Sequence, residues 1–167
     1  MIEAALILIK PDGVSRGLIG NILSKFDESG LKLVGIRMIK ATKEQAEEHY
    51  KELKDTPFFE DIVNYLIGKF HRRKEVFVAV YVGKNAIKKC RKTAGATNPE
   101  DADPMSIRGA YGRITTKGLY ENVVHVSSTK IEAKREIKLW FSPDEIAANL
   151  YLTKIKKFTN YKRRVWI

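Results

Sequence analysis

Four side chains in this sequence have the chemistry needed to bind or accept a phosphate. Lys10 follows an apolar segment, Arg91 and Arg108 lie on either side of a turn-rich loop, and His125 ends a second apolar segment. Arginine can form two hydrogen bonds to phosphate oxygens, and lysine supplies a compact positive charge. A neutral imidazole is the side chain best suited to act as a nucleophile near pH 7. These residues suit a phosphate ligand, although each of them alone is compatible with a structural role.

Alternating periodicities of apolar residues predict the elements that position these side chains. Apolar, β-branched and aromatic residues predict strands at residues 4–9, 34–39, 76–82 and 120–126. Spacings of three or four residues and helix-capping patterns predict the helices. These are expected at residues 18–26 with Gly30 as the cap, from Thr42, after Pro57, at residues 84–93, after Thr129 and from Ser142.

The order of these elements favours an α+β fold. Strand, helix, strand, two helices, strand, helix, a long loop at residues 94–105, strand and helix follow one another without a repeat or a linker. This order suits a ferredoxin-like split βαβ sandwich, with helices packed on an antiparallel sheet. We expect residues 1–167 to form a single domain. Because unrelated functions, RNA binding among them, use this layout, the fold does not identify the function.

The composition is that of an ordered protein with an excess of positive charge. The net charge of +11 favours polyanions, but it does not distinguish nucleic acid, an anionic membrane and small phosphorylated ligands. The single Cys90 cannot form an internal disulfide, which favours a reducing compartment. The apolar run near the N-terminus is too short for a signal sequence or a membrane span. We therefore expect a cytoplasmic protein without a membrane partner.

Seven motifs, in order, closely resemble those of the nucleoside diphosphate kinases. They cover nearly the whole chain, and such an ordered set is far more specific than a lone glycine motif. The motifs are residues 9–14 (IKPDGV), 16–20 (RGLIG), 55–59 (DTPFF), 94–99 (AGATNP), 106–109 (SIRG), 122–125 (NVVH) and 136–141 (EIKLWF).

The resemblance implies a ping-pong reaction through a phosphorylated histidine. A nucleoside triphosphate would phosphorylate His125, and a second diphosphate would then take the phosphoryl group. Tyr50 and Glu136 match the residues that hold the histidine in place in this family, and Ser127 corresponds to the serine beside it. The carboxylate would accept one ring N–H, which leaves the other nitrogen free for attack.

The resemblance also implies how the nucleotide phosphates are bound. Lys10, Arg91 and Arg108 match the phosphate-binding residues of the family, and Thr97 would contribute a hydroxyl. Mg²⁺ would arrive on the nucleotide phosphates, and no separate metal site held by the protein is predicted. The implied substrates are ATP and other nucleoside triphosphates and diphosphates.

Contacts to the ribose and the base follow from the same match. Asn122 and Lys10 match the ribose contacts, Phe58 the aromatic residue on which the base stacks, and Ile62 its apolar neighbour. Stacking without hydrogen bonds to base edges tolerates any base. The resemblance also implies a homo-oligomer, with a hexamer favoured and a tetramer or dimer as alternatives.

The sequence departs from the family pattern near the nucleophile. Val126, Ser128 and Ala110 replace a small residue and two aspartates. This leaves an alternative function, a nucleotide- or nucleic-acid-binding protein on the same fold with weakened phosphotransfer. Binding of nucleic acid is left open.

Two basic segments lie outside the seven motifs. One looks like an insertion near residues 68–75, and the other is the C-terminal tail, residues 154–167. The insertion is interpreted either as a solvated loop or as an interaction surface, and the solvated loop is favoured because loops tolerate insertion at little cost. His49 and His71 are interpreted as structural residues.

Overall fold

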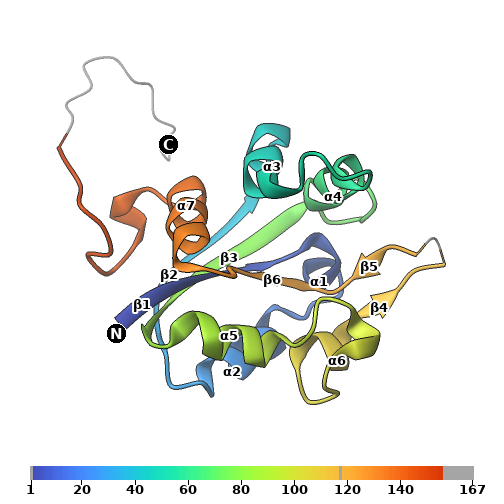
Figure 1. Ribbon diagram of the computed structural model, residues 1–167, viewed down its shortest axis with the longest axis horizontal. Coiled ribbons are helices and arrows are strands. Elements are labelled where there is room, and N and C mark those ends of the chain that lie inside the picture. The colour runs from blue at the N-terminus through green and yellow to red at the C-terminus, as the bar shows by residue number, and fades with distance from the viewer. Residues whose placement is uncertain (1, 117, 156–167) are drawn as a thin grey trace, which may run out of the picture.

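A four-stranded antiparallel sheet forms the centre of the computed structural model, which describes residues 2–116 and 118–155 (Figure 1). The strand order is β2-β3-β1-β6, and every neighbouring pair is antiparallel. A short hairpin of β4 and β5 forms a second sheet. The strands are β1 (Ile2–Ile9), β2 (Lys32–Lys40), β3 (Glu75–Lys84), β4 (Arg113–Ile114), β5 (Tyr120–Glu121) and β6 (Val124–Val126). The predicted α+β class, with helices packed on an antiparallel sheet, is confirmed.

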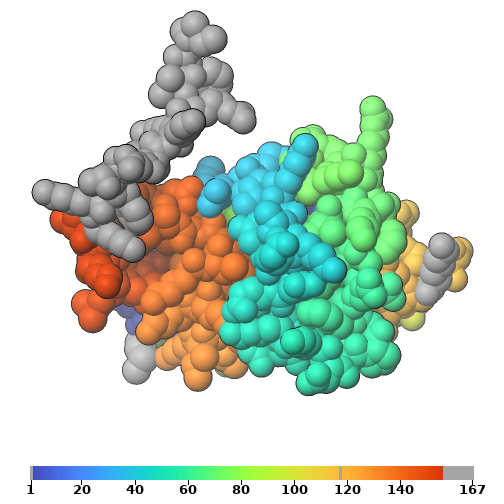
Figure 2. Space-filling view, turned by 90° about the horizontal axis from the view of Figure 1, so that it is seen from above, coloured from blue at the N-terminus to red at the C-terminus, as the bar shows by residue number. Residues whose placement is uncertain are grey.

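Helices cover both faces of the sheet. In Figure 1, α3, α4 and α7 lie above the sheet, and α2, α5 and α6 lie below it. Figure 2 shows the upper face, where the teal segment of α3 and α4 packs beside the orange segment of α7. The α-helices are α1 (Pro11–Ser15), α2 (Ile19–Asp27), α3 (Lys43–His49), α4 (Phe59–Leu66), α5 (Ala86–Ala94), α6 (Ile107–Tyr111) and α7 (Lys130–Trp140). Short 3₁₀ turns lie at η1 (Lys51–Leu53), η2 (Pro99–Asp101) and η3 (Pro143–Glu145).

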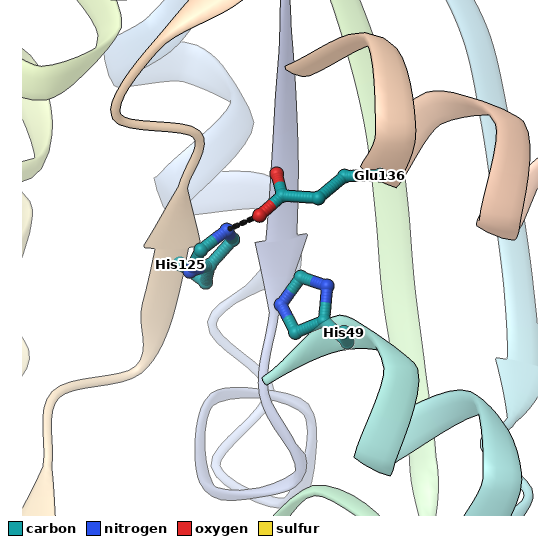
Figure 3. A group of neighbouring side chains, drawn as sticks. All are labelled: His49, His125 and Glu136. Atoms are coloured by element: carbon teal, nitrogen blue, oxygen red, sulfur yellow. Dashed lines mark hydrogen bonds and ion pairs between the residues drawn. The ribbon is translucent and has the colours of Figure 1, made fainter. Parts of the chain in front are cut away.

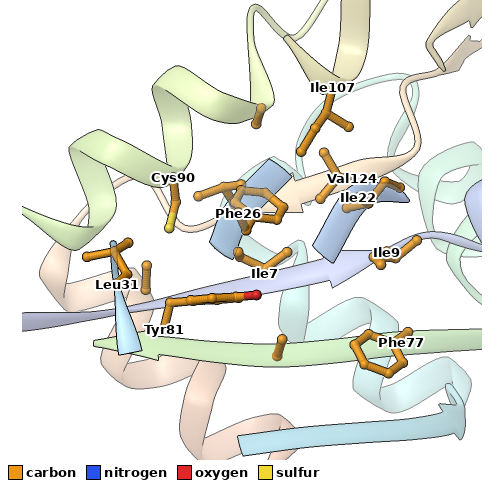
Figure 4. Packing of buried hydrophobic residues seen from close by; sticks show 14 of the residues in the cluster. Ile7, Ile9, Ile22, Phe26, Leu31, Phe77, Tyr81, Cys90, Ile107 and Val124 are labelled. Carbon is orange, nitrogen blue, oxygen red and sulfur yellow. The ribbon is translucent and has the colours of Figure 1, made fainter. Parts of the chain in front are cut away.

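The sheet separates two hydrophobic cores. Successive side chains of a strand point to opposite faces, so Ile7 packs with Phe26 and Tyr81 in one core (Figure 4), whereas Leu8 packs with Trp140 in the other. Both faces of the central strands are buried. This explains why β1 and β3 have nearly continuous apolar sequences rather than alternating ones.

The predicted capping patterns begin two of the helices. Thr42 forms a capping box with Gln45 at the start of α3. The Thr129 hydroxyl accepts a hydrogen bond from the Glu132 N–H at the start of α7. Each bond satisfies a backbone N–H that has no partner within its helix.

The helix predicted from Ser142 is wrong. Only the single 3₁₀ turn η3 forms there, and the chain then passes beside β2 without regular secondary structure, where Ala147 N donates to Val34 O at 2.7 Å. Ile146, Ala148 and Leu150 pack against the upper core. Tertiary packing therefore overrides the local capping signal.

The two basic segments differ in how far the structure describes them. Residues 68–75 connect α4 to β3 and are described in full. Residues 156–167, most of the predicted basic tail, lie outside the described residues. Within the described ranges, no helix has the length and apolar character needed to cross a bilayer.

Candidate active site

A buried hydrogen-bond chain orients the imidazole of His125. His125 lies on β6, and its Nε2 is 3.0 Å from Glu136 Oε1 on α7 (Figure 3). The other carboxylate oxygen accepts a hydrogen bond of 2.5 Å from Ser127 Oγ. Because an ionised carboxylate can only accept, Nε2 carries the proton and Nδ1 keeps its lone pair. The geometry therefore leaves Nδ1 as the ring nitrogen with a free lone pair.

The charge of Glu136 is maintained despite its burial. Burial opposes ionisation, but the positive charge on protonated His125 and the hydrogen bonds from His125 and Ser127 outweigh it and hold the pKa of Glu136 below its usual range. The carboxylate is therefore ionised at neutral pH, as a hydrogen-bond acceptor for the imidazole must be.

A cavity of about 640 Å³ opens beside His125 and collects the predicted site residues from separate parts of the chain. All of them except Ser127, which lies behind the carboxylate, line this cavity. They are Lys10, Tyr50, Phe58, Ile62, Arg91, Thr97, Arg108, Asn122, His125 and Glu136.

Three cations give one part of the cavity a positive potential. Burial lowers the pKa of Lys10 to about 8; Asp12 opposes this shift and Arg108 adds to it. Burial, helped by Arg91, also lowers the pKa of Arg108 to about 10. Within the part of the chain that the structure describes, no carboxylate lies in ion-pair contact with these three cations. They remain available to an anionic ligand.

Backbone carbonyls hold the Arg108 side chain in place. Its Nε and Nη2 donate to Val124 O at 3.2 and 2.9 Å, and its Nη1 donates to Gly95 O at 2.8 Å. Arg108 therefore links the long loop to the strand that carries His125. A preorganised cation of this kind costs little reorganisation when charge develops in a transition state.

Asn122 connects the cationic part of the cavity to the long loop. Its Oδ1 accepts from Lys10 Nζ at 2.7 Å, and its Nδ2 donates to the Thr97 carbonyl at 2.8 Å. The three residues come from the end of β1, the loop after α5 and the segment before β6. The predicted ribose and phosphate contacts thus lie next to one another.

Aromatic side chains line the other part of the cavity. Phe58, at the start of α4, is 48% exposed, and Ile62 lies one turn further along the same helix. An exposed ring beside a cavity is suited to stacking against a planar ligand. Tyr50 makes an edge-on ring contact with His125, at 6.3 Å between centroids.

A strained turn corrects the prediction of one strand at residues 120–126. The segment divides into β5 and β6, because Val123 adopts a φ of 54° and Val124 N donates to Asn122 O at 2.6 Å. A β-branched residue rarely adopts positive φ. The Val123 N–H donates to Asp12 Oδ2 at 3.0 Å, which supports the turn. Asn122 and His125 both line the cavity on either side of it.

Several lining residues were not predicted from the sequence. Tyr65 lies beneath Lys10, whose Nζ is 5.7 Å from the ring centroid, and its spacing of three residues from Ile62 was the available signal. Leu119 belongs to the β4–β5 connection, where no periodicity marks it. His49 also lines the cavity, although the sequence analysis interpreted it as a structural residue. Its position next to Tyr50 was the available signal.

The basic insertion is anchored beside this cavity. His71 contacts Tyr65 edge-on, at 4.8 Å between ring centroids, and its Nδ1 is 3.9 Å from Glu121 Oε1. The Arg73 N–H donates to Ser15 Oγ at 3.3 Å. Lys69, Arg72 and Lys74 are exposed.

Three neighbouring side chains in the cavity have the composition of a metal site. His49, His125 and Glu136 offer ligand atoms within 4.8 Å of one another, the one such group among the described residues. Two histidines and a carboxylate also hold zinc in some enzymes. However, Trp140 Nε1 donates to His49 Nδ1 at 3.2 Å, so His49 Nε2 carries a proton and has no lone pair for a metal. This arrangement favours a hydrogen-bonded cluster over a metal centre.

The departures from the family pattern leave the hydrogen bonds around His125 in place. Val126 is a buried strand residue without positive φ. Ser128 Oγ accepts from Arg91 Nη1 at 3.1 Å, and Ser128 N donates to Glu132 Oε2 at 3.0 Å. Ala110 is exposed on α6. The carboxylate of Glu132 therefore contacts the backbone of the position that lacks an acidic side chain.

Comparisons with known proteins identify the family of this chain. The family model described as nucleoside diphosphate kinase matches residues 3–146. The chain is 48% identical over 145 residues to the nucleoside diphosphate kinase of Pyrococcus furiosus, covering 87% of this chain and 86% of that protein. It is 46% identical over 145 residues to the enzyme of Thermococcus kodakarensis, covering 87% and 80%.

Solved structures of the same family are similar in three dimensions. The Halobacterium salinarum nucleoside diphosphate kinase in complex with CDP has a TM-score of 0.78 at 38% identity and covers 87% of this chain and 91% of that one. The Borrelia burgdorferi enzyme with bound vanadate and ADP, a transition-state mimic, has a TM-score of 0.77 at 32% identity and covers 97% and 93%. The chain belongs to the nucleoside diphosphate kinase family, and its activity is that of a nucleoside diphosphate kinase.

Proposed function

We propose that the transfer proceeds in two steps through a phosphohistidine at Nδ1 of His125. In the first step a bond forms between Nδ1 and the γ-phosphorus as the bond to the bridging oxygen breaks and the diphosphate leaves. In the second step an oxygen of another diphosphate attacks the same phosphorus and restores the free imidazole. The observation that carries the proposal is the His125–Glu136–Ser127 chain, which puts the ring proton on Nε2.

The cations of the cavity would serve both steps. Lys10, Arg91 and Arg108 are proposed to bind the phosphates and to follow the charge of the transferring group, with the Thr97 hydroxyl as a further contact. Their support is the absence of competing carboxylates among the described residues, together with the carbonyl bonds that hold Arg108. Mg²⁺ would enter on the nucleotide phosphates and add positive charge there.

The nucleoside would occupy the aromatic part of the cavity. Phe58 is proposed to stack on the base beside Ile62, and Asn122 and Lys10 to bind the ribose. The solved relatives hold CDP in one case and ADP in another, so both a pyrimidine and a purine diphosphate are proposed as substrates here. Stacking explains this tolerance because every base has a π-face.

Assembly and location remain predictions from the sequence. We propose a homo-oligomer of a single-domain chain, with the hexamer favoured, located in the cytoplasm. The basic insertion at residues 68–75 is proposed to be part of the domain rather than a separate module, because His71 and Arg73 contact β5 and α1.

A labelling experiment tests the histidine relay. The purified protein is incubated with γ-labelled ATP and Mg²⁺, freed of nucleotide, and given UDP; His125→Ala and His71→Ala are treated in parallel. We expect wild type and His71→Ala to take up an acid-labile label and release it as UTP, while His125→Ala takes up none. His71 is the matched control because it lies outside the set of residues that line the cavity.

Two outcomes would contradict the proposal. Label retained by His125→Ala would place the phosphoryl group on another residue. A wild-type protein that binds ATP but takes up no label would favour the nucleotide- or nucleic-acid-binding alternative, with the departures at Val126, Ser128 and Ala110 as the cause.

A further inference from the structure

The structure defines the tautomer of His49, the last residue of α3. His49 is 2% exposed, and its Nδ1 lies 3.2 Å from Trp140 Nε1 on α7. An indole nitrogen can only donate, so His49 Nδ1 must accept and the proton must be on Nε2. Burial, reinforced by the charges of His125 and Arg135, holds the pKa of His49 well below its usual range. His49 is therefore a neutral imidazole with one defined N–H.

This N–H has no conventional acceptor and points at the nucleophile. Among the described residues, no hydrogen-bond partner reaches His49 Nε2. Figure 3 shows the Nε2 side of the His49 ring turned toward His125. The ring centroids are 4.4 Å apart and the planes meet at 74°. At this separation two rings cannot meet edge to edge, so the N–H edge of His49 lies against the face of the His125 ring.

We propose that His49 is a positioning residue for the nucleophile: Trp140 fixes its tautomer, and its N–H edge packs on the face of His125 and holds that ring with Nε2 toward Glu136. The inference rests on the proposed role of His125 as nucleophile. An aromatic ring has an electron-rich face and a positive edge, and an N–H directed at such a face is weakly attractive. The buried Nε2–H of His49, which lacks a conventional acceptor, is thereby directed at the His125 ring.

Two contacts at right angles then restrict rotation of the His125 ring. The hydrogen bond to Glu136 fixes one edge, and His49 supports one face. Neither contact alone prevents the ring from tilting, because a single hydrogen bond leaves a pivot. Misplacement of a reacting atom by about 1 Å can cost about 100-fold in rate, so support for the ring matters to the chemical step.

Three variants separate positioning from general packing. His49→Phe keeps a ring but removes both nitrogens. His49→Gln places an amide N–H₂ near the position of Nε2. Trp140→Phe keeps His49 but releases its tautomer. Phe26→Leu is the matched control, because Phe26 is fully buried in the core on the opposite face of the sheet.

The measurement is the rate of phosphohistidine formation together with the steady-state kcat and KM. We expect kcat of His49→Phe to fall about 10- to 100-fold, with KM changed less than about twofold, because nucleotide contacts are untouched. Trp140→Phe should lose less, and His49→Gln should recover part of kcat. Phe26→Leu should lower thermal stability without changing kcat.

The outcomes that would overturn the inference differ from those that bear on the relay itself. Unchanged kcat in folded His49→Phe, or an effect confined to KM, would contradict positioning by His49. If His49→Phe does not fold, unchanged kinetics in both His49→Gln and Trp140→Phe would have the same meaning. Failure of the wild type to form phosphohistidine would instead contradict the proposed function.

Discussion

At His125, one hydrogen bond decides which ring nitrogen keeps its lone pair. Glu136 accepts the Nε2 proton, and Ser127 donates to the same carboxylate from behind. Glu136 can accept this hydrogen bond only because it stays ionised when buried, which requires hydrogen-bond donors to both of its carboxylate oxygens. A substitution of any one residue in the His125–Glu136–Ser127 hydrogen-bond chain therefore alters both the orientation of the imidazole and the charge of the carboxylate.

The charge of Lys10 predicts a pH dependence on the alkaline side. Its pKa, lowered by burial to about 8, means that the free enzyme loses this positive charge as the pH rises through about 8. We expect kcat/KM, which reports ionisations of the free enzyme, to fall above that pH. Bound phosphates favour the charged form, so kcat should fall less.

The control for this prediction is Lys10→Gln. It should have a low kcat/KM at every pH and no alkaline limb near pH 8, because the titrating group is absent. An alkaline limb that persists in Lys10→Gln would assign the ionisation to another group.

At the scale of elements, the site depends on short connections as well as on helices and strands. The positive-φ turn at Val123 lets Asn122, just after β5, and His125, on β6, line the same cavity. The periodicity of residues 120–126 is that of one strand, since Val and Tyr favour extended structure whether or not the strand is interrupted. The break depends on Asp12, which is distant in sequence, so no local pattern could reveal it.

The two ends of the insertion near residues 68–75 approach each other closely at Gly68. This residue has a φ of 75°, and a Cβ there would lie 2.5 Å from the Lys74 Cα. Gly17 has a similar φ of 71°, but a Cβ there would meet nothing within 4 Å. We expect Gly68→Ala to lower the free energy of unfolding by about 2–4 kcal/mol and Gly17→Ala by about 1–2 kcal/mol, because only the former adds a backbone clash to the strain of positive φ.

Urea denaturation of the two variants measures this difference. Equal losses would mean that the insertion shifts to accommodate the methyl group, and that its closure contributes little to the stability of the domain.

At the scale of the whole molecule, the sheet ends in an apolar edge. β2 is the outermost strand, and Ile36 and Met38 on it are 57% and 44% exposed. Exposed apolar edge strands are prone to pair with other chains unless they are protected. This surface supports the expected homo-oligomer, which a net charge of +11 would otherwise oppose through mutual repulsion.

We expect Ile36→Asp to shift the protein to a smaller species in light scattering coupled to size-exclusion chromatography. A charge placed at an apolar contact must be buried without a partner, which is costly. Ile131→Asp is the control, because Ile131 is 84% exposed on α7 and is not part of β2. An unchanged mass for Ile36→Asp would exclude this edge as a contact between copies.

The sequence alone determined the family, the fold class and about half of the residues that line the cavity. It could do so because motifs and apolar periodicity are local properties of the chain. The tertiary structure decided the break at Val123, the path of the chain after η3 and the tautomers of His49 and His125. Each of these depends on a partner far away in sequence: Asp12, Val34, Trp140 and Glu136, respectively. A hydrogen bond across the fold selects among conformations and tautomers that the local sequence leaves nearly equal in energy.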